Sequence, residues 1–360
     1  VIDIQEAASA LGRAFKTAEK VAGGQIDSVI AAVRGNFIEG INSKGVANIP
    51  SKEVSESIRD EALYSAREGI KLDNGKEVLQ IIAREYFLDS QRVQNPLQME
   101  GNMLEIDALG FVANTMNLNN ILKAMDIAEI NCSNKIYGYM AVCDILLRKE
   151  EKESGCLLVD FGGYTTGIVQ YDDGILKYAY ELPVGSEYIT KDLMHKLRAS
   201  SQEAASIKIN HGAAFCADEF QDREFEYRAA DGVTMMKADR REIVEQVITP
   251  RIEQIFAFID EVVKKKASRS MPGNIILTGG GSRLEYIAGA FEKYFDEARP
   301  FVRIGFPIED KVAGPREIVG NSVYSCAIGA VYCALSDFYY SSDSSTGKVG
   351  KFTNWLKEIF

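Results

Sequence analysis

Histidine, tryptophan and long apolar runs are scarce in this chain of 360 residues. The only histidines are His195 and His211, and none of the six cysteines forms a C-x-x-C pair. Because zinc sites are built from clustered Cys and His ligands, a zinc centre is not expected. No run approaches the roughly 18 consecutive apolar residues of a membrane-spanning helix. The scattered cysteines indicate reduced core residues of a cytoplasmic protein.

A basic surface is also missing. The 52 acidic residues outnumber the 41 basic ones, which gives a net charge of −11. A chain with this charge is repelled as a whole by nucleic acid and by anionic membranes. It has no basic stripe with interleaved aromatics, so no nucleic-acid partner is expected. Its length suggests two domains or one large bilobed domain.

The first third of the chain alternates helix and strand patterns. Apolar spacing predicts a helix within residues 1–24. NFIEGINSKGVANI is predicted as strands around a turn at Lys44-Gly45, and Ser51 is predicted to cap the following helix. Two long runs, KEVLQIIAREYFLDS and MLEIDALGFVANT, are predicted strands. Residues 26–128 are therefore expected to form a compact α+β unit.

The pattern changes from residue 129 onward. GCLLVDF, TGIVQYD and GILKYAYELP are predicted strands, and Asp173-Gly174 is a strong hairpin signal between the last two. A long helix is expected over 240–267, with Pro250 as a kink or break. NIILT is predicted as a short buried strand, GGGS as a loop and RLEYIAGAFEKYF as a helix.

The last residues have a different composition. SSDSSTGKVG is typical of a flexible linker, and KFTNWLKEIF repeats apolar residues on one face of a helix. That face consists of Phe352, Trp355, Leu356, Ile359 and Phe360. We expect it to enter the headgroup boundary of a membrane while neighbouring lysines meet anionic lipid. The alternative is a terminal helix docked on its own domain, which the polar linker disfavours.

Two glycine-rich loops are candidate phosphate sites. In LLVDFGGYTTGIV, small residues follow Asp160, so backbone N–H groups can point at a phosphate and the carboxylate can hold the water shell of Mg2+. In NIILTGGGSRLEYI, three glycines separate a strand from a helix N-terminus, which favours anions. Taken alone, each loop is explained more simply as a turn without a ligand.

Together, the two loops resemble the signature of the actin-like ATPase superfamily, in which two lobes close on a nucleotide. Stretches over nearly the whole chain, such as ELPVGSEYITKDL and IILTGGGSRLEYIAGAFEKYF, are similar to the FtsA family of bacterial division proteins. Asn95-Pro96…Gly101 and the amphipathic tail are further marks of that family. The resemblance implies an α/β, actin-like (ribonuclease H-like) two-lobed ATPase fold with an FtsA-type 1C subdomain.

The resemblance also implies subdomain boundaries. The expected order is part of 1A (1–25), 1C (26–128), the rest of 1A (129–154), 2A (155–211), 2B (212–270), the rest of 2A (271–337), a linker (338–350) and a membrane-targeting helix (351–360). The family's first phosphate loop, a D-I-G-T-like hairpin, is absent from the sequence given.

The ligands implied by the resemblance are ATP and Mg2+, with at most weak ATPase activity. Asp160 resembles the family's metal-water aspartate, which acts at the phosphates. Lys208 resembles the lysine of an E-x-x-K helix near the ribose and base. The remaining positions that match nucleotide contacts are Gly162, Gly163, Thr165, Thr166, Gly279, Gly280, Gly281 and Ser282.

Three residues depart from the family pattern. Tyr164 stands where the family has a third glycine, and Gly167 stands where it has a closing aspartate. Ala205 replaces the glutamate of the E-x-x-K helix. The side chain at 164 either crowds the phosphates or points away from them, and the three changes together suggest a relaxed nucleotide site.

The resemblance implies a cell-division adaptor on the cytoplasmic side of the inner membrane, at the septum. Its expected partners are the FtsZ C-terminal tail, further copies of the chain in a filament, the anionic membrane surface and other division proteins. Arg241 matches a position that binds the acidic, apolar FtsZ tail, where arginine is chemically sensible. The alternative for Arg241 is a solvated residue at the start of a helix.

Two other functions remain open from the sequence. A metabolic kinase of the same superfamily would have a substrate cleft with a catalytic base and no lipid-seeking tail. A PilM-like pilus-assembly platform protein would share the extra subdomain but would not be expected to carry this tail.

Overall fold

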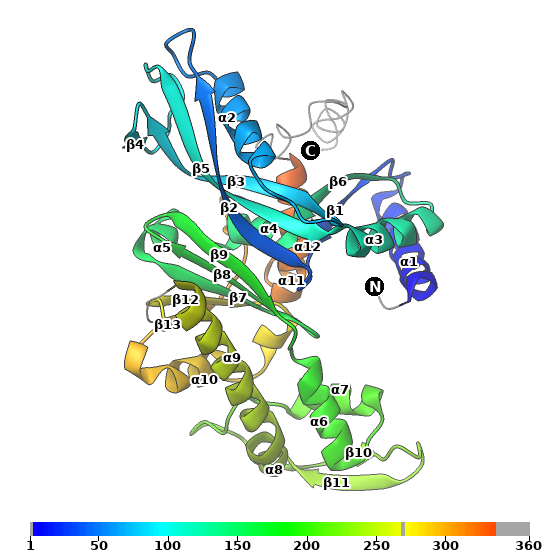
Figure 1. Cartoon of the computed structure of the whole chain (residues 1–360). Helices are drawn as coiled ribbons and strands as arrows, with labels where there is room; N and C mark the ends of the chain where they lie inside the picture. The colour runs from blue at the N-terminus through cyan, green and yellow to red at the C-terminus, as the bar shows by residue number, and fades with distance from the viewer. Residues whose placement is uncertain (1–2, 268–270, 336–360) are drawn as a thin grey trace. The chain divides into compact units, whose positions relative to one another are not determined.

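The computed structural model describes residues 3–267 and 271–335 (Figure 1). The chain divides into two compact units. The first contains the residues up to Val142 together with those from Cys326 onward, and the second runs from Cys143 to Ser325.

A four-stranded antiparallel sheet, in the order β2-β5-β3-β4, is the main element of the first unit. Its strands are β2 (Ile38–Asn48), β3 (Lys76–Leu88), β4 (Gln91–Val93) and β5 (Met103–Asn114). Helix α2 (Glu56–Glu68) covers one face of the sheet, where Ala62 and Ala66 are completely buried beside Ile106 and Ala108 (Figure 1). The predicted α+β unit is thus a sheet with one covering helix.

Two local predictions in this region were wrong. β2 runs without a turn through Lys44 and Gly45, because the glycine serves the close approach of α2: a Cβ on Gly45 would lie 1.9 Å from the carbonyl oxygen of Ala62. Helix α2 is capped by Ser55, not by Ser51. The hydroxyl of Ser51 instead donates to the Glu53 carbonyl oxygen at 2.9 Å, within the preceding turn.

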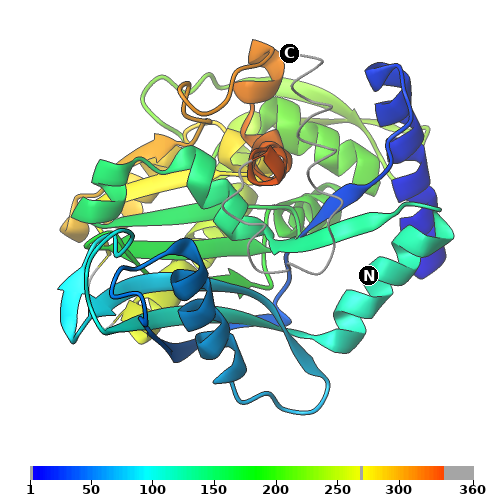
Figure 2. The same ribbon diagram turned by 90° about the horizontal axis from the view of Figure 1, so that it is seen from above.

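The rest of the first unit surrounds a short parallel strand pair. β1 (Val29–Val33) pairs with β6 (Cys132–Tyr137), and Ile136 packs with Ala141 and with Cys333 of α12 (Ser325–Leu335). Helices α1 (Ile4–Ala22) and α3 (Thr115–Ile127) lie side by side in both ribbon views (Figures 1 and 2).

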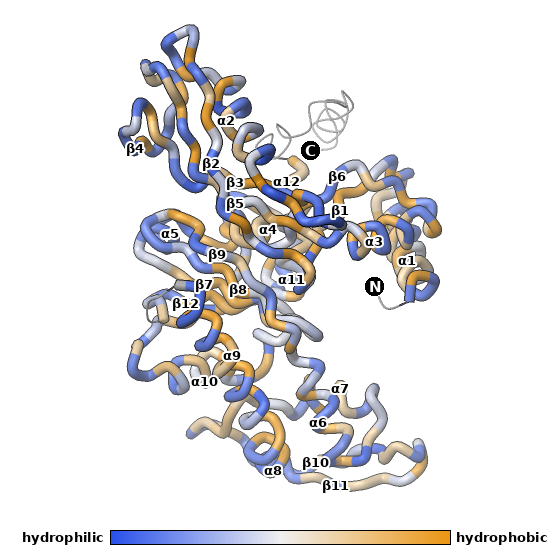
Figure 3. Tube along the Cα trace, in the orientation of Figure 1, coloured by the Kyte–Doolittle hydropathy of each residue, from blue (hydrophilic) through white to orange (hydrophobic). Residues whose placement is uncertain are grey.

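The second unit is built on a five-stranded sheet in the order β13-β12-β7-β8-β9. The strands are β7 (Cys156–Phe161), β8 (Thr166–Asp172), β9 (Ile175–Leu182), β12 (Asn274–Thr278) and β13 (Phe301–Ile304). β7, β8 and β9 are antiparallel neighbours, whereas β12 is parallel to both β7 and β13. Every residue of β7 is buried, and the central strands are largely apolar (Figure 3).

Helix α4 (Gly138–Leu146) crosses the boundary between the two units at Val142. The other α-helices described in the second unit are α5 (Lys149–Ser154), α6 (Glu187–Leu197), α7 (Ser201–His211), α8 (Arg240–Ile243), α9 (Thr249–Ala267), α10 (Ile287–Tyr294) and α11 (Arg316–Val319). A hairpin of β10 (Glu224–Arg228) and β11 (Met235–Asp239) precedes α8.

The predicted break near Pro250 is confirmed. A π-helical turn, Val244–Ile248, separates α8 from α9, and the amide of Thr249 donates to the Val244 carbonyl. Proline has no N–H to donate to a helical carbonyl, so regular α-helical bonding cannot continue through it. Helix α10 begins later than predicted, because Tyr286 adopts a left-handed backbone conformation with φ 60°.

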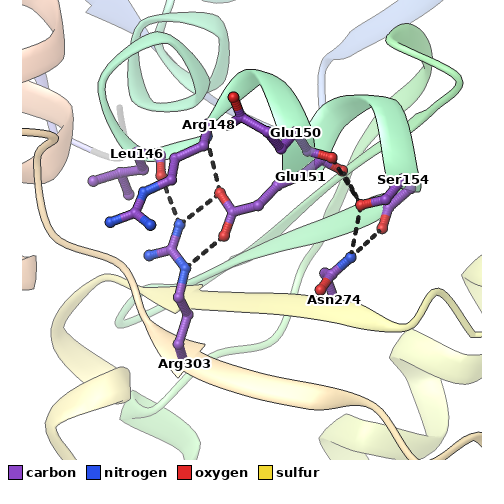
Figure 4. Close-up of polar contacts among 8 residues, drawn as sticks. Leu146, Arg148, Glu150, Glu151, Ser154, Asn274 and Arg303 are labelled. Atoms are coloured by element: carbon purple, nitrogen blue, oxygen red, sulfur yellow. Dashed lines mark hydrogen bonds and ion pairs between the residues drawn. The ribbon is translucent and has the colours of Figure 1, made fainter.

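An ion pair fastens α5 to the sheet (Figure 4). Arg303 of β13 holds Glu151 through two hydrogen bonds, from Nε to Oε1 at 2.7 Å and from NH2 to Oε2 at 2.8 Å. The same NH2 donates to the Leu146 carbonyl oxygen at 2.8 Å, and the Arg148 amide donates to Glu151 at 2.8 Å. A single guanidinium therefore joins β13 to the end of α4 and the start of α5.

A second contact reaches the other end of α5 (Figure 4). The side-chain amide of Asn274, at the start of β12, donates to Ser154 Oγ at 3.1 Å and to the Gly155 carbonyl oxygen at 3.0 Å. Both ends of the short helix are thus attached to the parallel half of the sheet.

The replacement Glu151→Gln should lower the free energy of unfolding at pH 7 by about 1–3 kcal/mol, because it removes a charged partner from a mostly buried pair. Burial opposes ionisation of Glu151, but the hydrogen bonds from Arg303 and the Arg148 amide outweigh it, so the pKa of Glu151 is lowered. The stabilisation is therefore present above the unfolded-state pKa, about 4.3, and is lost as pH falls through the folded-state pKa.

Urea unfolding at several pH values measures this difference. Glu153→Gln is the matched control, since Glu153 lies on the same helix but is half exposed in an i,i+4 pair with Lys149. The control should change stability by less than about 0.5 kcal/mol. Equal losses for the two variants, or a Glu151→Gln loss that persists at pH 3, would contradict the assignment.

Candidate functional site

The two glycine-rich loops begin side by side. β7 and β12 are parallel neighbours, and Asp160 is in register with Thr278 at their carboxyl ends. The loop after β7 and the loop after β12 therefore start at the same edge of the sheet. The structure brings together the two segments that the sequence paired only by their order in the chain.

The loop after β12 passes directly over Asp160. Gly279 has φ +80°, and a Cβ at this position would lie 2.4 Å from Asp160 Oδ1 and 2.7 Å from the Phe161 carbonyl oxygen. Only a residue without a side chain permits this approach. Asp160 itself is buried, so its carboxylate lies beneath the loop.

A network of buried hydroxyl groups holds the second loop. Ser282 Oγ lies within hydrogen-bonding distance of the Gly279 carbonyl oxygen, at 2.8 Å, and of Ser322 Oγ, at 2.9 Å. Thr278 Oγ1 lies 2.8 Å from Ser325 Oγ, which is also buried. Ser282, predicted as a nucleotide contact, thus uses its hydroxyl to shape the loop.

The turn of the first loop rests on the start of α6. The amide of Ser186 donates to the Gly162 carbonyl oxygen at 2.9 Å, and that of Glu187 donates to the Gly163 carbonyl oxygen at 2.7 Å. A Cβ on Gly185 would lie 2.5 Å from the same Gly163 oxygen, so this position also requires glycine. This support was not predicted from the sequence, although the residues that provide it lie in the stretch ELPVGSEYITKDL.

The two threonines of the first loop have different environments. Thr166 is completely buried, and its hydroxyl donates to the Val184 carbonyl oxygen at 2.8 Å. This placement gives Thr166 a structural role in the loop and leaves the half-buried Thr165 nearer the surface. Gly163 is exposed, and a Cβ there would meet no heavy atom of the described chain within 4 Å.

Tyr164 points outward from the turn. Its side chain is 67% exposed, and the Nζ of Lys191, on α6, lies 5.8 Å from the centre of its ring. The sequence left open whether this ring crowds the phosphates or points away from them. In the structure, the ring is directed toward α6.

Lys208 is directed at the start of α6. Its Nζ donates to the Ser186 carbonyl oxygen at 3.1 Å and to Thr190 Oγ1 at 2.8 Å, and lies 3.9 Å from Glu187. Burial lowers the pKa of Lys208, while Glu187 opposes this change. The lysine thus braces the helix whose amides hold the first glycine loop.

The register of the sheet shows which carboxylates would lie near an acidic side chain at position 167, where this chain has glycine. Thr278, Asp160, Gly167 and Glu181 are in register across β12, β7, β8 and β9. Residues directly opposite one another project from the same face. An aspartate at 167 would therefore lie beside Asp160, and the buried carboxylate of Glu181 is one strand further away.

This edge of the sheet suits a phosphate-bearing ligand. It combines two glycine loops, an exposed turn at Gly163 and the carboxylate of Asp160 at the end of β7. Among residues 3–267 and 271–335, no group of three or more Asp, Glu, His or Cys side chains could hold a metal directly. Mg2+ bound through water by Asp160, together with ATP phosphates, is compatible with this donor set.

A separate groove of about 530 Å³ lies between α6 and the π-turn to α9. Its lining consists of Asp192, His195, Lys196, Gln246, Val247, Pro250, Arg251 and Gln254. Arg251 holds Asp192 through Nε at 2.6 Å and NH2 at 2.9 Å. His195 and Lys196 are exposed beside the groove, and the Nζ of Lys196 lies 3.0 Å from Glu242 Oε1.

Arg241 does not line this groove. Its guanidinium holds Asp222 Oδ2 at 2.8 Å and Glu245 Oε1 at 3.2 Å, on a partly exposed surface. The sequence pattern predicted a partner role for Arg241 and none for Arg251. The structure makes Arg251 the arginine of the groove.

A further cavity, of about 640 Å³, belongs to the first unit. It lies between α2 and β3, with Leu63, Val78 and Ile81 among its apolar lining and Arg59 and Arg67 at α2. Within the described chain, β3 pairs with β4 only over Tyr86–Leu88. The rest of this edge of β3 borders the cavity, which Asn134, Lys135 and Ile136 of β6 also line.

Comparisons with known proteins agree on one family. The family model for cell division protein FtsA matches residues 157–329, and that for the SHS2 domain inserted in FtsA matches residues 35–110. The cell division protein FtsA of Pseudomonas aeruginosa is 27% identical, covering 100% of this chain and 88% of that protein. FtsA of Neisseria meningitidis serogroup B is 28% identical, covering 93% and 80%.

A solved structure shares the fold at low identity. A chain of the PilM-PilN type IV pilus biogenesis complex superposes with a TM-score of 0.57 and 14% identity, covering 93% of this chain and 85% of that chain. The predicted actin-like α/β fold is confirmed, and the SHS2 match falls within the block predicted as subdomain 1C.

The replacement Gly279→Ala should lower the free energy of unfolding by roughly 2 kcal/mol or more, because it combines a left-handed backbone with a Cβ placed against Asp160. Gly280→Ala is the matched control in the same loop: its nearest neighbour would be Val323 Cγ2 at 4.0 Å, and its φ is not left-handed. Urea unfolding compares the two. Equal effects would mean that the close approach over Asp160 does not constrain the loop.

Proposed function

Since the chain belongs to the FtsA family of actin-like cell-division proteins, we propose that it binds ATP with Mg2+, forms filaments and connects FtsZ to the cytoplasmic face of the inner membrane. The observation that carries the nucleotide part is the parallel pairing of β7 with β12. It brings both glycine loops to Asp160 at one edge of the sheet.

Each residue of the proposed nucleotide site has a distinct task. The exposed backbone at Gly163 receives phosphate, while Gly162 and Gly279 give the loops their shape. Asp160 holds the water shell of Mg2+, which when bound neutralises phosphate charge. Lys208 acts indirectly, by stabilising the start of α6. The remaining proposed contacts come from Gly280, Gly281 and Thr165.

Hydrolysis by this chain is expected to be weak at most. A carboxylate is missing at Gly167, directly opposite Asp160, and at Ala205 on the helix of Lys208. Fewer carboxylates leave fewer groups to orient a metal or an attacking water. In this proposal, nucleotide serves mainly to stabilise the fold and the filament.

The replacement Gly163→Val should reduce nucleotide affinity at least tenfold, about 1.4 kcal/mol, because a branched side chain would occupy the open space at the turn. The fold should persist, since no described atom lies within 4 Å of the added Cβ. Asp160→Ala should weaken binding in the presence of Mg2+. Equilibrium titration with a fluorescent ATP analogue measures both effects.

Gly24→Val is the control for that titration. Gly24 lies in the first unit, also without a neighbour within 4 Å of the added Cβ, and its φ is not left-handed. It should bind nucleotide like the wild type. Unchanged affinity for Gly163→Val, or no binding by the unmodified chain, would sink the nucleotide proposal.

The groove between α6 and α9 is the proposed site of the FtsZ tail. The tail implied by the family resemblance is acidic and apolar, which suits a groove that places Arg251 and Lys196 beside Val247 and Pro250. Arg251 is the proposed anchor, since it can exchange Asp192 for a tail carboxylate. The partner role of Arg241 stays a prediction, and the same binding experiment tests it.

Membrane attachment rests on the sequence pattern alone. Phe352, Trp355, Leu356, Ile359 and Phe360 lie outside the described residues, as does the linker 338–350. No helix within residues 3–267 and 271–335 is long and apolar enough to cross a bilayer. One short amphipathic helix binds weakly, so filament formation would supply the several copies needed for stable attachment.

Peptide recruitment to liposomes tests the adaptor function. A fluorescent peptide of the FtsZ C-terminal tail should sediment with anionic vesicles only when the protein is present. Deletion of residues 348–360 should leave both protein and peptide in solution. Arg251→Ala should leave the protein on the vesicles and lower peptide affinity about tenfold or more, as expected for a charged anchor.

Arg241→Ala is the matched arm of this assay, because it removes an arginine from the neighbouring surface. A loss with Arg241→Ala and none with Arg251→Ala would move the tail site to Arg241. Lipid binding unchanged by the deletion would refute attachment through the tail.

The alternatives from the sequence receive less support. The PilM complex shares the fold at 14% identity, whereas both matching family models are those of FtsA. The comparisons likewise assign the chain to a cell-division family and not to a metabolic kinase. Filament formation and recruitment of other division proteins stay predictions from the family resemblance.

A further inference from the structure

A row of aromatic and cationic side chains joins the first glycine loop to the α6–α9 groove. Lys191 Nζ lies 5.8 Å from the ring centre of Tyr164 and 4.8 Å from that of Tyr188. The guanidinium of Arg251 lies 5.8 Å from the Tyr188 ring centre and also holds Asp192. The outward tyrosine of the phosphate loop is thus the first member of a row that ends in the groove.

Helix α6 joins the same two places through its backbone. Its first amides, those of Ser186 and Glu187, donate to the carbonyls of Gly162 and Gly163. Its later residues, from Asp192 to Lys196, line the groove. Figure 1 shows α6 running from the end of the five-stranded sheet toward α8 and β11.

The helix is held firmly in the core between these ends. Ile189, Leu193 and Leu197 are buried in the main apolar cluster of the second unit. Close-packed interiors deform little, so a displacement at the first turn is transmitted along the helix. α6 therefore provides a stiff connection between the loop and the groove.

We propose that nucleotide at the glycine loops and the acidic tail in the groove weaken each other's binding through this row. This inference rests on the proposed function. Two cations, Lys191 and Arg251, share the ring of Tyr188. Phosphate at the loop attracts Lys191 toward Tyr164. The ring of Tyr188 then interacts with Arg251 alone, so Tyr188 and Asp192 bind that guanidinium more strongly. Arg251 is therefore less available to a tail carboxylate.

The coupling must be reciprocal. If nucleotide raises the Kd of the tail by some factor, the tail raises the Kd of nucleotide by the same factor. We expect each ligand to raise the Kd of the other about fivefold or more at low ionic strength, which is the lower end of typical allosteric coupling. Added salt should reduce the factor, since exposed charges are screened.

The experiment measures both dissociation constants in a closed cycle. The Kd of a fluorescent FtsZ tail peptide is determined with and without saturating Mg2+ and a non-hydrolysable ATP analogue, and that of the analogue with and without peptide. Lys191→Met should bring the factor close to one while each ligand alone still binds. Tyr188→Leu, which removes the shared ring, should do the same.

Lys265→Met is the matched control. Lys265 lies on α9, paired with Glu261 and largely exposed, so the same charge is removed away from the row. This variant should keep the wild-type factor. Thermal unfolding of all three variants checks that each is folded.

The outcomes separate the inference from the proposed function. If both ligands bind but neither affects the other, or if each strengthens the other, the inference is overturned and the proposed function stands. Coupling that survives in Lys191→Met and Tyr188→Leu also overturns it. If either ligand fails to bind the unmodified chain, the proposed function fails and the inference falls with it.

Discussion

The parallel pairing of β12 with β7 is the constraint on which the site depends. Its register sets Thr278 against Asp160, so two loops that are distant in the sequence leave the sheet at one edge. A shift by one residue would turn every side chain of β12 to the other face. Gly279 then crosses the end of β7 at a distance that only glycine permits. The hydroxyl network around Ser282 fixes the loop in that position.

Support for the first loop comes from backbone groups of α6. The carbonyls of Gly162 and Gly163 accept from the first amides of that helix, and Lys208 holds the same turn from α7. Lys208 thus supports the first glycine loop indirectly, through its hydrogen bonds to Ser186 and Thr190 at the start of α6. The arrangement makes α6 common to the first glycine loop and the α6–α9 groove, since residues of its other end line that groove.

Two of the three departures from the family pattern, Tyr164 and Gly167, lie in the first loop and at the start of β8, and the third, Ala205, lies on α7. Gly167 leaves Asp160 without the carboxylate expected directly opposite, and Tyr164 directs its ring toward Lys191. Gly167 and Ala205 stand where the family pattern has carboxylates, and Tyr164 adds a contact toward α6. Under the proposed function, these changes leave fewer groups for hydrolysis beside a loop that α6 supports through its backbone.

The sequence by itself determined the elements and their class. Apolar periodicity, the Asp173-Gly174 hairpin and Pro250 identified most strands, helices and the helix break, because these signals are local. The order of the two glycine loops pointed correctly to the actin-like fold. Only the tertiary structure decided that the hydroxyls of Thr166 and Ser282 form hydrogen bonds inside the protein. It also decided that Gly45 permits the close packing of α2 and that Arg251 lines the groove. Those outcomes depend on contacts between residues far apart in the chain, which neither periodicity nor turn chemistry encodes.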